Sequence, residues 1–408
     1  MKNSTQKPNT FTSPEEIAKN LCCSETMTLS LCQYLKYRSL IGTKMPENCR
    51  AKDRKEGKEI LERIGQETRA LPVPFSASHP EKPFPFVRIL MEERLRQNKR
   101  ANAIREAFPD LPVSAISHYK DVLNRTAGDS QDGKALILAE KKGMLLYPGA
   151  PVCQDFGNRH FYYASNVMNC IFDCEYCYLK GMYPASHMVV FVNTEDYFRE
   201  TEELLKKHPV YLCISYDTDL PAVEKWTGLL SEWLAFASGR EDLTLEIRTK
   251  FADSSFFEQH EPLDNTIFAF TLSPDAVSRT FEHFTPPLSA RLSAVKAAME
   301  KGFQVRLCFD PMLFCEDWKT LYGEMVSLIA DEINLSEIRD CSIGTFRISS
   351  EYLRSMRKKC PNSAVVQYPY VNARGVYGYE KKLSEEMTSY LMLKIHKYIS
   401  EEKIFLWK

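Results

Sequence analysis

The sequence has no excess of charge of one sign and no long hydrophobic run. Its 53 Lys and Arg residues nearly balance 54 Asp and Glu residues, which gives a net charge of -1 at pH 7. Because there is no global basic field, contact with a nucleic acid would need a local patch. No apolar run is long enough for a bilayer span, and no signal-like apolar segment follows a basic start. We therefore expect a cytoplasmic protein with no membrane partner, and the oligomeric state stays open.

The sequence also lacks the even cysteine count of a complete disulfide framework. It has 13 cysteines, an odd number and a large one for the cytosol, where thiols stay reduced. We expect most of them to be small buried side chains or metal ligands.

Length and composition indicate a large soluble protein with more than one region. The chain has 408 residues, of which 44% are hydrophobic and 26% are charged, so one small core is not enough. We predict an N-terminal helical region with a proline-rich linker (1–115), a barrel with a lead-in segment (116–350) and a C-terminal region (351–408).

Several local features are expected in the N-terminal region. Apolar residues at 17–40 favour an ordinary helical pair over a DNA-binding helix-turn-helix, because recognisable turn chemistry is missing. Residues 44–58 hold several Lys and Arg, which is more typical of a solvated face than of a phosphate patch. The proline-rich stretch 71–86 is typical of a surface linker, and a helix is predicted from Val87 to Ala107.

From about residue 160 onward, strand and helix patterns alternate, which indicates βα units and a parallel sheet. The predicted strands are 160–165, 209–216, 243–249, 266–272, 303–310 and 338–348. The predicted helices are 194–207, 221–237, 288–301 and 316–330, with two more at 350–359 and 384–400. Six such units predict an α/β fold with a partial (β/α)6 barrel, in which the chemistry sits at the carboxyl ends of the strands.

Three cysteines share one short loop just after the first predicted strand. The run from Asn169 is NCIFDCEYCYLK, which places Cys170, Cys174 and Cys177 at spacings of three and two intervening residues. Thiolates hold iron–sulfur clusters, and three of them leave one iron of a 4Fe-4S cluster open for a bound molecule. This spacing is similar to that of radical S-adenosylmethionine (SAM) enzymes, in which the cluster cleaves SAM reductively. The cysteines are therefore predicted to be cluster ligands, with SAM as the second cofactor.

Two other interpretations of the three cysteines remain. A structural zinc site needs four closed ligands, and His160 or His187 would be the nearest candidates for the fourth. Three buried cysteines without a metal are the other alternative, which so tight a cluster makes uncommon.

Longer stretches of the sequence resemble the spore photoproduct lyase family. The run CEYCYLKGMYP carries tyrosines on both sides of the last cluster cysteine, Tyr176 and Tyr178, as in that family. Further similar segments follow in the same order along the chain. They are 118–125 (HYKDVLNR), 149–163 (GAPVCQDFGNRHFYY), 246–250 (EIRTK), 268–287 (FAFTLSPDAVSRTFEHFTPP) and 291–313 (RLSAVKAAMEKGFQVRLCFDPML).

The resemblance implies a DNA repair lyase and assigns roles to several residues. The family repairs a methylene-bridged thymine dimer through a 5′-deoxyadenosyl radical that takes hydrogen from C6 of the lesion. By motif match, Lys250, Thr218 and Thr271 would hold SAM together with Tyr178, and Thr271 stands where the family usually has serine. A cationic lysine suits the carboxylate of the methionine moiety. Tyr176 and Tyr178 are the catalytic candidates beside the cluster. A reductant such as flavodoxin or ferredoxin is the implied electron donor.

The sequence departs from the family at the hydrogen donor. The family has a cysteine just past the second strand, and the matching position is Tyr216. Cys213 lies three residues earlier, where an extended strand would turn it to the opposite face. Tyr216 is therefore the catalytic candidate for hydrogen return, with Cys308, Cys315 and Cys153 as spare thiols.

DNA contact is expected from the C-terminal segment 368–382 (YPYVNARGVYGYEKK). It interleaves tyrosines with basic residues, and Gly375 allows a tight hairpin. The candidate DNA residues are Arg347, Arg374, Tyr377 and Lys381. A plain aromatic hairpin packed on the barrel is the alternative.

Three functions fit these features. The first is a spore photoproduct lyase type of DNA repair enzyme. The second is a radical SAM enzyme that acts on another nucleobase or a small molecule, which Tyr216 favours. The third is a non-enzymatic metal-binding protein that binds DNA.

Overall fold

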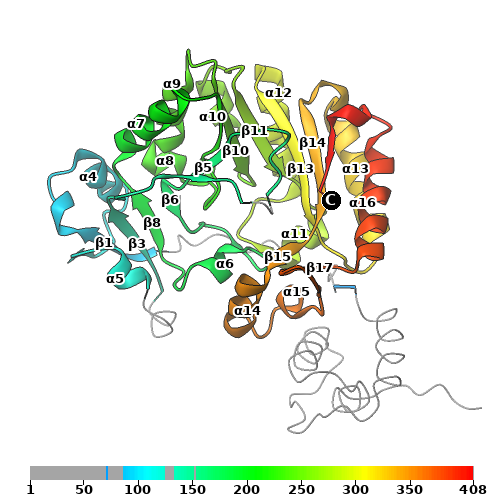
Figure 1. Cartoon of the computed structure of the whole chain (residues 1–408), viewed down its shortest axis with the longest axis horizontal. Coiled ribbons are helices and arrows are strands. Elements are labelled where there is room, and N and C mark those ends of the chain that lie inside the picture. Colours follow the sequence, from blue (N-terminus) through cyan, green and yellow to red (C-terminus); the bar gives the residue numbers. More distant parts are fainter. Residues whose placement is uncertain (1–69, 72–85, 125–132, 151–152, 408) are drawn as a thin grey trace, which may run out of the picture.

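The computed structural model describes residues 70–71, 86–124, 133–150 and 153–407 (Figure 1). The features expected at 17–40 and 44–58, and nearly all of the proline-rich stretch 71–86, lie outside these ranges. Within them, every helix is too short or too polar to cross a bilayer.

A small parallel sheet forms one side of the molecule, at the left of Figure 1. Its strand order is β2-β1-β3-β8-β6, and every neighbouring pair is parallel except β8 and β6. The strands are β1 (Phe86–Glu92), β2 (Val113–Ile116), β3 (Lys134–Ala139), β6 (Val167–Met168) and β8 (Met188–Phe191). The short helix α5 (Lys120–Leu123) lies between β2 and β3 in the chain.

The helix predicted from Val87 to Ala107 is wrong over its first part. Residues Phe86–Glu92 form β1, which gains a parallel neighbour on each side, and the helical parts are a 3-10 turn at Glu93–Leu95 and α4 (Lys99–Glu106). The amide of Ala101 donates to Asn98 Oδ1 at 2.9 Å, which caps α4 at its start. Pairing with distant strands decided the conformation of this apolar run, and the local pattern did not.

The larger sheet has eight strands in the order β18-β14-β13-β11-β10-β9-β5-β4. All neighbouring pairs from β5 to β18 are parallel, and β4 joins antiparallel. The strands are β4 (Leu146–Pro148), β5 (Phe161–Ala164), β9 (Val210–Cys213), β10 (Leu243–Thr249), β11 (Thr266–Thr271), β13 (Gln304–Met312), β14 (Asp340–Thr345) and β18 (Ile404–Leu406). The strands predicted from about 160 to 310 are therefore confirmed within a few residues.

Helices separate the parallel strands as the sequence predicts (Figure 1). They are α7 (Thr194–Leu205), α8 (Glu224–Thr227), α9 (Leu229–Ala237), α10 (Ser254–Gln259), α11 (Asp275–Phe281), α12 (Leu288–Lys301) and α13 (Trp318–Glu332). The predicted helix 221–237 is interrupted, because Gly228 adopts a left-handed φ of 67° between α8 and α9.

The C-terminal part forms a separate small sheet beside the larger one. Its order is β15-β17-β16, with β15 (Arg347–Ser349), β16 (Val371–Ala373) and β17 (Val376–Gly378). The helices are α14 (Ser350–Lys359), α15 (Ala364–Gln367) and α16 (Lys381–Ile395). The strand predicted at 338–348 therefore ends early, at Thr345, and Arg347 belongs to the small sheet. The last helix begins and ends earlier than predicted.

The segment around Phe156, which lies between β4 and β5 in the chain, packs against side chains of the larger sheet. The ring of Phe156 lies 3.3 Å from the guanidinium carbon of Arg306 and meets the ring of Phe405 edge-on at 5.2 Å. These contacts anchor the segment that carries Cys153, which packs against the same buried cluster.

Candidate active site

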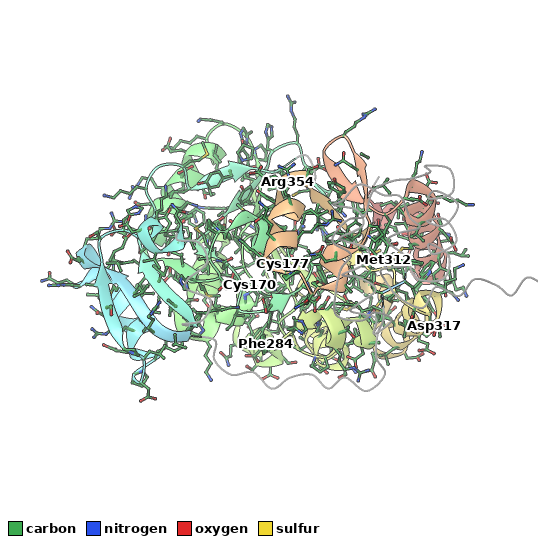
Figure 2. All side chains as sticks on the ribbon, turned by 90° about the horizontal axis from the view of Figure 1, so that it is seen from below. Cys170, Cys177, Phe284, Met312, Asp317 and Arg354 are labelled. Carbon is green, nitrogen blue, oxygen red and sulfur yellow. The ribbon has the colours of Figure 1, made fainter. Side chains whose placement is uncertain are left out.

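One cavity of about 390 Å³ lies where several parallel strands of the larger sheet end. It gathers all the residues that the sequence predicted for the cluster, for SAM and for catalysis, and Arg347 as well. These are Cys170, Cys174, Cys177, Tyr176, Tyr178, Tyr216, Thr218, Lys250 and Thr271. Figure 2 shows Cys170 and Cys177 close together near the middle of the molecule.

Local backbone contacts shape the cysteine loop between β6 and α6 (Leu179–Met182). Asn169 has a left-handed φ of 66°, and its side-chain Nδ2 donates to the carbonyls of Ala185 at 3.0 Å and His187 at 2.7 Å. The amide of Cys177 donates to the carbonyl of Cys174 at 3.2 Å. Since Asn tolerates a positive φ better than most residues, it suits the start of this turn.

A second, longer-range contact fixes the same loop. Strand β7 (Asp173–Cys174) pairs antiparallel with β12 (Glu282–His283), and the amide of Glu175 donates to the carbonyl of Phe281 at 2.8 Å. The cysteine loop is thereby held from the far end of α11.

The three thiols are free, with Cys174 buried and Cys170 and Cys177 half-buried. Burial raises the pKa of Cys174 to about 12 and also raises the pKa of Cys170 and of Cys177. A thiolate in such surroundings needs a cation, which cluster iron provides. The donor set therefore fits an iron–sulfur cluster.

The zinc interpretation gains no fourth ligand from the predicted histidines. Neither is among the residues that line the cavity. His160 stacks on His208 with ring centroids 3.8 Å apart, and His187 accepts from the amide of Ala135 at 3.1 Å. In the described ranges, no three His, Cys, Asp or Glu side chains converge on a point as the ligands of one ion do. A four-iron cluster differs in this respect, because each of its thiolates binds a separate iron.

A buried ion pair supports the thiol side of the cavity. Glu282 Oε2 lies 2.6 Å from Arg291 Nη2, and both side chains are about 1% exposed or less. Tyr176 and Ser273 donate hydrogen bonds to the other carboxylate oxygen. Burial opposes ionisation of Glu282, but Arg291 and Lys250 outweigh it and lower the pKa of Glu282 to about 2.

Lys250 and Thr218 bring a cation and a hydroxyl to the cavity. The Lys250 ammonium lies 5.4 Å from the centre of the Tyr176 ring. The Lys250 amide and the Thr249 hydroxyl donate to Asp219, at 2.6 Å and 2.7 Å, which fixes the end of β10. The Thr218 hydroxyl is buried and has no hydrogen-bond partner among the described residues. A buried hydroxyl without a partner is costly, so this atom fits a site that a ligand completes.

A second group of residues at the cavity consists of tyrosines around Asp217. The hydroxyls of Tyr178 and Tyr183 donate to this buried carboxylate at 3.2 Å and 2.9 Å, and Ser165 donates as well. Burial raises the pKa of Asp217, although these hydrogen bonds oppose the rise. Tyr178 also donates to the backbone carbonyl of Tyr216 at 2.7 Å.

Tyr216 follows the end of β9, so it lies in a loop and not in the predicted strand 209–216. Its hydroxyl oxygen lies 2.7 Å from Cys153 Sγ, and both residues line the cavity. Cys213 is the last residue of β9 and is fully buried. Neither it nor the spare thiols Cys308 and Cys315 are among the cavity-lining residues.

Arg347 lines the cavity, but its charge is already paired. Its Nη1 and Nη2 atoms each lie 2.8 Å from an oxygen of Asp310, and its guanidinium carbon lies 4.1 Å from the centre of the Trp407 ring. A free cationic contact to DNA phosphate would require this pair to open.

The other predicted DNA residues lie outside the cavity. Arg374 and Gly375 form the turn of the hairpin β16–β17, with φ of 51° and 87°. Arg374 is exposed, Tyr377 is half-buried and the Lys381 side chain is 89% exposed. Val376 of the hairpin lines the cavity, so the hairpin stands at its rim.

Several residues of the site were not singled out from the sequence. Asp217 and Asp219 lie in SYDTD, and Glu282 and Asp310 lie in segments that already resembled the family. Their acidic character beside family motifs was the available signal. Tyr352, which also lines the cavity, carried no comparable signal.

An α/β protein with three free thiols, a lysine and an unpaired hydroxyl in one cavity belongs to the class of candidate iron–sulfur enzymes. The family model described as spore photoproduct lyase matches residues 161–406, more than half of the chain. The chain therefore belongs to the spore photoproduct lyase family. This is a family of radical SAM enzymes that use a 4Fe-4S cluster and SAM.

Individual relatives agree with this membership. A spore photoproduct lyase of Clostridium acetobutylicum is 23% identical over 255 residues, which covers 58% of this chain and 74% of the relative. One from Bacillus subtilis is 25% identical over 161 residues, or 38% of this chain and 47% of the relative.

Solved structures share the fold. Spore photoproduct lyase complexed with dinucleoside spore photoproduct has a TM-score of 0.64 at 16% identity, over 80% of this chain and 99% of that one. A double mutant with bound AdoMet and the dinucleoside has a TM-score of 0.64 at 17% identity over the same shares.

Proposed function

We propose that this chain repairs spore photoproduct, a methylene-bridged thymine dimer in DNA, as a radical SAM lyase. The observation that carries this proposal is the gathering of three free thiols, Lys250 and the unpaired Thr218 hydroxyl in one cavity. Family membership supports it, since spore photoproduct lyases are carbon–carbon lyases of this type. The relatives' structures with bound dinucleoside support DNA as the partner.

Each cavity residue has a role in this proposal. Cys170, Cys174 and Cys177 hold a 4Fe-4S cluster and leave its fourth iron open. Bound together, the cluster and SAM supply a 5′-deoxyadenosyl radical for hydrogen abstraction at C6 of the lesion. Lys250 pairs with the SAM carboxylate, because its ammonium lines the cavity beside the ring of Tyr176, next to the cysteines.

The hydroxyl residues and tyrosines orient the bound molecules. Thr218 and Thr271 donate hydrogen bonds to SAM, and the rings of Tyr176 and Tyr178 flank the last cluster cysteine. The hydroxyls of both tyrosines already donate within the protein, so their rings keep one orientation. We further propose that the six parallel strands from β5 to β14 form the partial (β/α)6 barrel that the sequence predicts.

The hairpin β16–β17 is the proposed DNA contact. A lesion inside a duplex must leave the stack to reach a buried cavity. The exposed Arg374 at the hairpin turn, with Tyr377 and Lys381, offers charge and an aromatic ring at the cavity rim. Arg347 joins them when its pair with Asp310 opens. A flavodoxin or ferredoxin would deliver the electron in the cytoplasm.

The test is turnover of synthetic dinucleoside spore photoproduct by anaerobically reconstituted protein with SAM and dithionite. We expect thymidine products together with 5′-deoxyadenosine. Release of no 5′-deoxyadenosine by protein with a complete cluster would contradict the radical SAM role and favour a binding protein.

A different substrate is the second candidate, because Tyr216 occupies the position of the family's donor cysteine. Cleavage of SAM by fully reconstituted protein that leaves the dinucleoside intact would support this candidate and contradict the lyase proposal.

A further inference from the structure

A further arginine lines the cavity, and part of its guanidinium group has no partner. Arg248 lies on β10, two residues before Lys250, and both residues line the cavity. Its Nε atom pairs with the Glu246 carboxylate, and its Nη2 atom donates to the backbone carbonyl of Gln154 at 3.4 Å. Its Nη1 atom makes no hydrogen bond to the residues that the structure describes. The side chain is 30% exposed, so its free N–H groups can meet a molecule in the cavity.

The ion pairs behind Arg248 leave one positive charge without a carboxylate. Arg306 lies 3.5 Å from the Glu246 carboxylate and 2.9 Å from an oxygen of Asp340. Arg339 lies 3.3 Å from the same Asp340 carboxylate. Within the described residues, three guanidinium groups therefore share two carboxylates. Arg248 is the member of this network that lines the cavity, so it brings the surplus charge to a bound anion.

The other cations that line the cavity already have a partner or a role. Both terminal nitrogens of Arg347 lie 2.8 Å from the oxygens of Asp310. Lys250 is assigned to the SAM carboxylate in the proposed function. Arg248 is thus the cavity cation that remains for the substrate.

Contacts with three parts of the chain fix the position of the Arg248 side chain. Glu246 is fully buried, so its pair with Arg248 Nε is shielded from water. The guanidinium carbon lies 5.8 Å from the centre of the Phe156 ring. The Ser215 hydroxyl donates to the backbone carbonyl of Arg248 at 2.9 Å. A guanidinium group held in this way loses little freedom when it binds an anion.

We propose that Arg248 binds the phosphate that links the two nucleosides of the lesion. This inference rests on the proposed function, and it names the anionic dinucleotide, rather than the bare dinucleoside, as the molecule that the cavity fits. A phosphodiester carries one negative charge, which balances the surplus charge of the arginine network. A neutral base carbonyl could accept the same hydrogen bond but would leave that charge unbalanced.

The first experiment compares two ligands that differ in one charge. The spore photoproduct dinucleotide has an anionic phosphodiester, and its methylphosphonate analogue has nearly the same shape without the charge. We expect the reconstituted wild-type protein, without SAM, to bind the charged ligand about 10–100-fold more tightly, because a hydrogen bond to a charged group is worth this factor. Isothermal titration calorimetry measures both affinities. Equal affinities would overturn the inference.

Variants of Arg248 show whether this residue reads the charge. Arg248→Met should bind the two ligands equally, whereas Arg248→Lys keeps the charge and should retain part of the preference. Arg199→Met is the control, because Arg199 is 70% exposed, pairs with Asp196 on α7 and does not line the cavity. This control should keep the wild-type preference. An undiminished preference in Arg248→Met would overturn the inference, because the charge would then be bound elsewhere.

Turnover gives a second measurement that does not depend on how well a variant folds. The dinucleoside lacks the phosphate, so general damage to the fold affects it and the dinucleotide alike. In Arg248→Met, we expect KM for the dinucleotide to rise by about 10–100-fold relative to KM for the dinucleoside. The loss should appear mainly in KM, since the phosphate contact is made equally before and during the reaction.

The outcomes separate the inference from the proposed function. An unchanged ratio of the two KM values in Arg248→Met would overturn the inference and leave the lyase proposal intact. A wild-type protein that cleaves SAM and converts neither substrate would overturn the proposed function. The binding comparison needs no reaction, so it tests the anion site in either case.

Discussion

The two sides of the cavity are stabilised in different ways. On the thiol side, the cysteine loop rests on the buried pair Glu282–Arg291. On the tyrosine side, neutral hydroxyls surround Asp217, and rings stack from Tyr216 onto Tyr163. The first side places an ion pair beside the cysteines, whereas the second surrounds a single buried carboxylate with neutral O–H donors.

This difference suits opposite halves of one radical reaction. A buried ion pair is rigid and intolerant of change, because removing one partner leaves an uncompensated charge. Neutral hydrogen-bond donors lose less when one of them is removed. We therefore expect substitutions on the thiol side to have the larger effects, and the following predictions test that order.

The largest effect is expected at the cysteines themselves. Cys174→Ala should abolish the iron–sulfur absorbance and SAM cleavage, since a cluster held by two thiolates is not stably bound. Visible absorbance, iron content and 5′-deoxyadenosine release after reconstitution measure this. Cys341→Ala, a buried cysteine outside the cavity, is the matched control and should keep the cluster. Full SAM cleavage by Cys174→Ala would refute the ligand assignment.

The second largest effect is expected for Arg291→Met, which should lower the free energy of unfolding by about 3–5 kcal/mol. The substitution leaves the Glu282 carboxylate buried without its counter-ion. Urea denaturation of the cluster-free protein measures the loss. Arg279→Ala removes a half-exposed pair with Asp275 at 3.3 Å and should cost no more than about 1 kcal/mol. Equal losses in the two variants would contradict the importance of the buried pair.

The buried Lys141, which interacts with Asp217, predicts a pH dependence of the free energy of unfolding. Burial lowers the pKa of Lys141 to about 8, although Asp217 and Glu200 oppose the shift. The folded-state pKa lies below the unfolded one, so folding excludes a proton between these values and stability rises with pH there. Lys141→Met should remove a rise of about 1.4 kcal/mol per pH unit between roughly pH 8 and 10.

The free energy of unfolding is measured against pH for the wild type and for Lys141→Met. The difference between the two curves separates the contribution of Lys141 from that of the tyrosines, which titrate at higher pH. The exposed neighbour in Lys142→Met serves as the control, and it should keep the wild-type rise. The assignment fails if Lys141→Met and the wild type give parallel curves from pH 7 to 10.

The smallest effect is expected on the neutral side. Tyr183→Phe removes one of three donors to Asp217 and should cost about 1.5 kcal/mol of unfolding free energy. Tyr147→Phe removes a more exposed hydrogen bond to the carbonyl of Met144 and should cost less. A loss in Tyr183→Phe as large as that in Arg291→Met would break the proposed contrast between the two sides.

Much of this site was visible in the sequence because its parts are local. Cys170, Cys174 and Cys177 lie within one loop, so their spacing alone indicates a shared metal group. Strand ends such as Lys250 and Thr271 converge in any parallel sheet, and the cavity gathers both. The predicted hairpin at 368–382 is confirmed for the same reason, since Arg374–Gly375 forms a local turn.

Other features depended on contacts between distant parts of the chain. The run at Val87 has an apolar pattern that suits a helix or a strand, and two parallel neighbours made it a strand. Glu282 reaches the cysteine loop through the pairing of β12 with β7 and the hydrogen bond from Tyr176. The charge pair of Arg347 with Asp310 likewise joins two strands, so this candidate DNA residue is already paired within the protein.

The sequence by itself therefore determined the iron–sulfur motif, the alternation of strands and helices, and the family. These depend on spacings within a few residues and on periodicity, which sequence records directly. Only the tertiary structure decided that Tyr216 has a thiol beside it. Cys153 lies there because its segment packs against the larger sheet through the contact of Phe156 with Arg306, which no local pattern encodes.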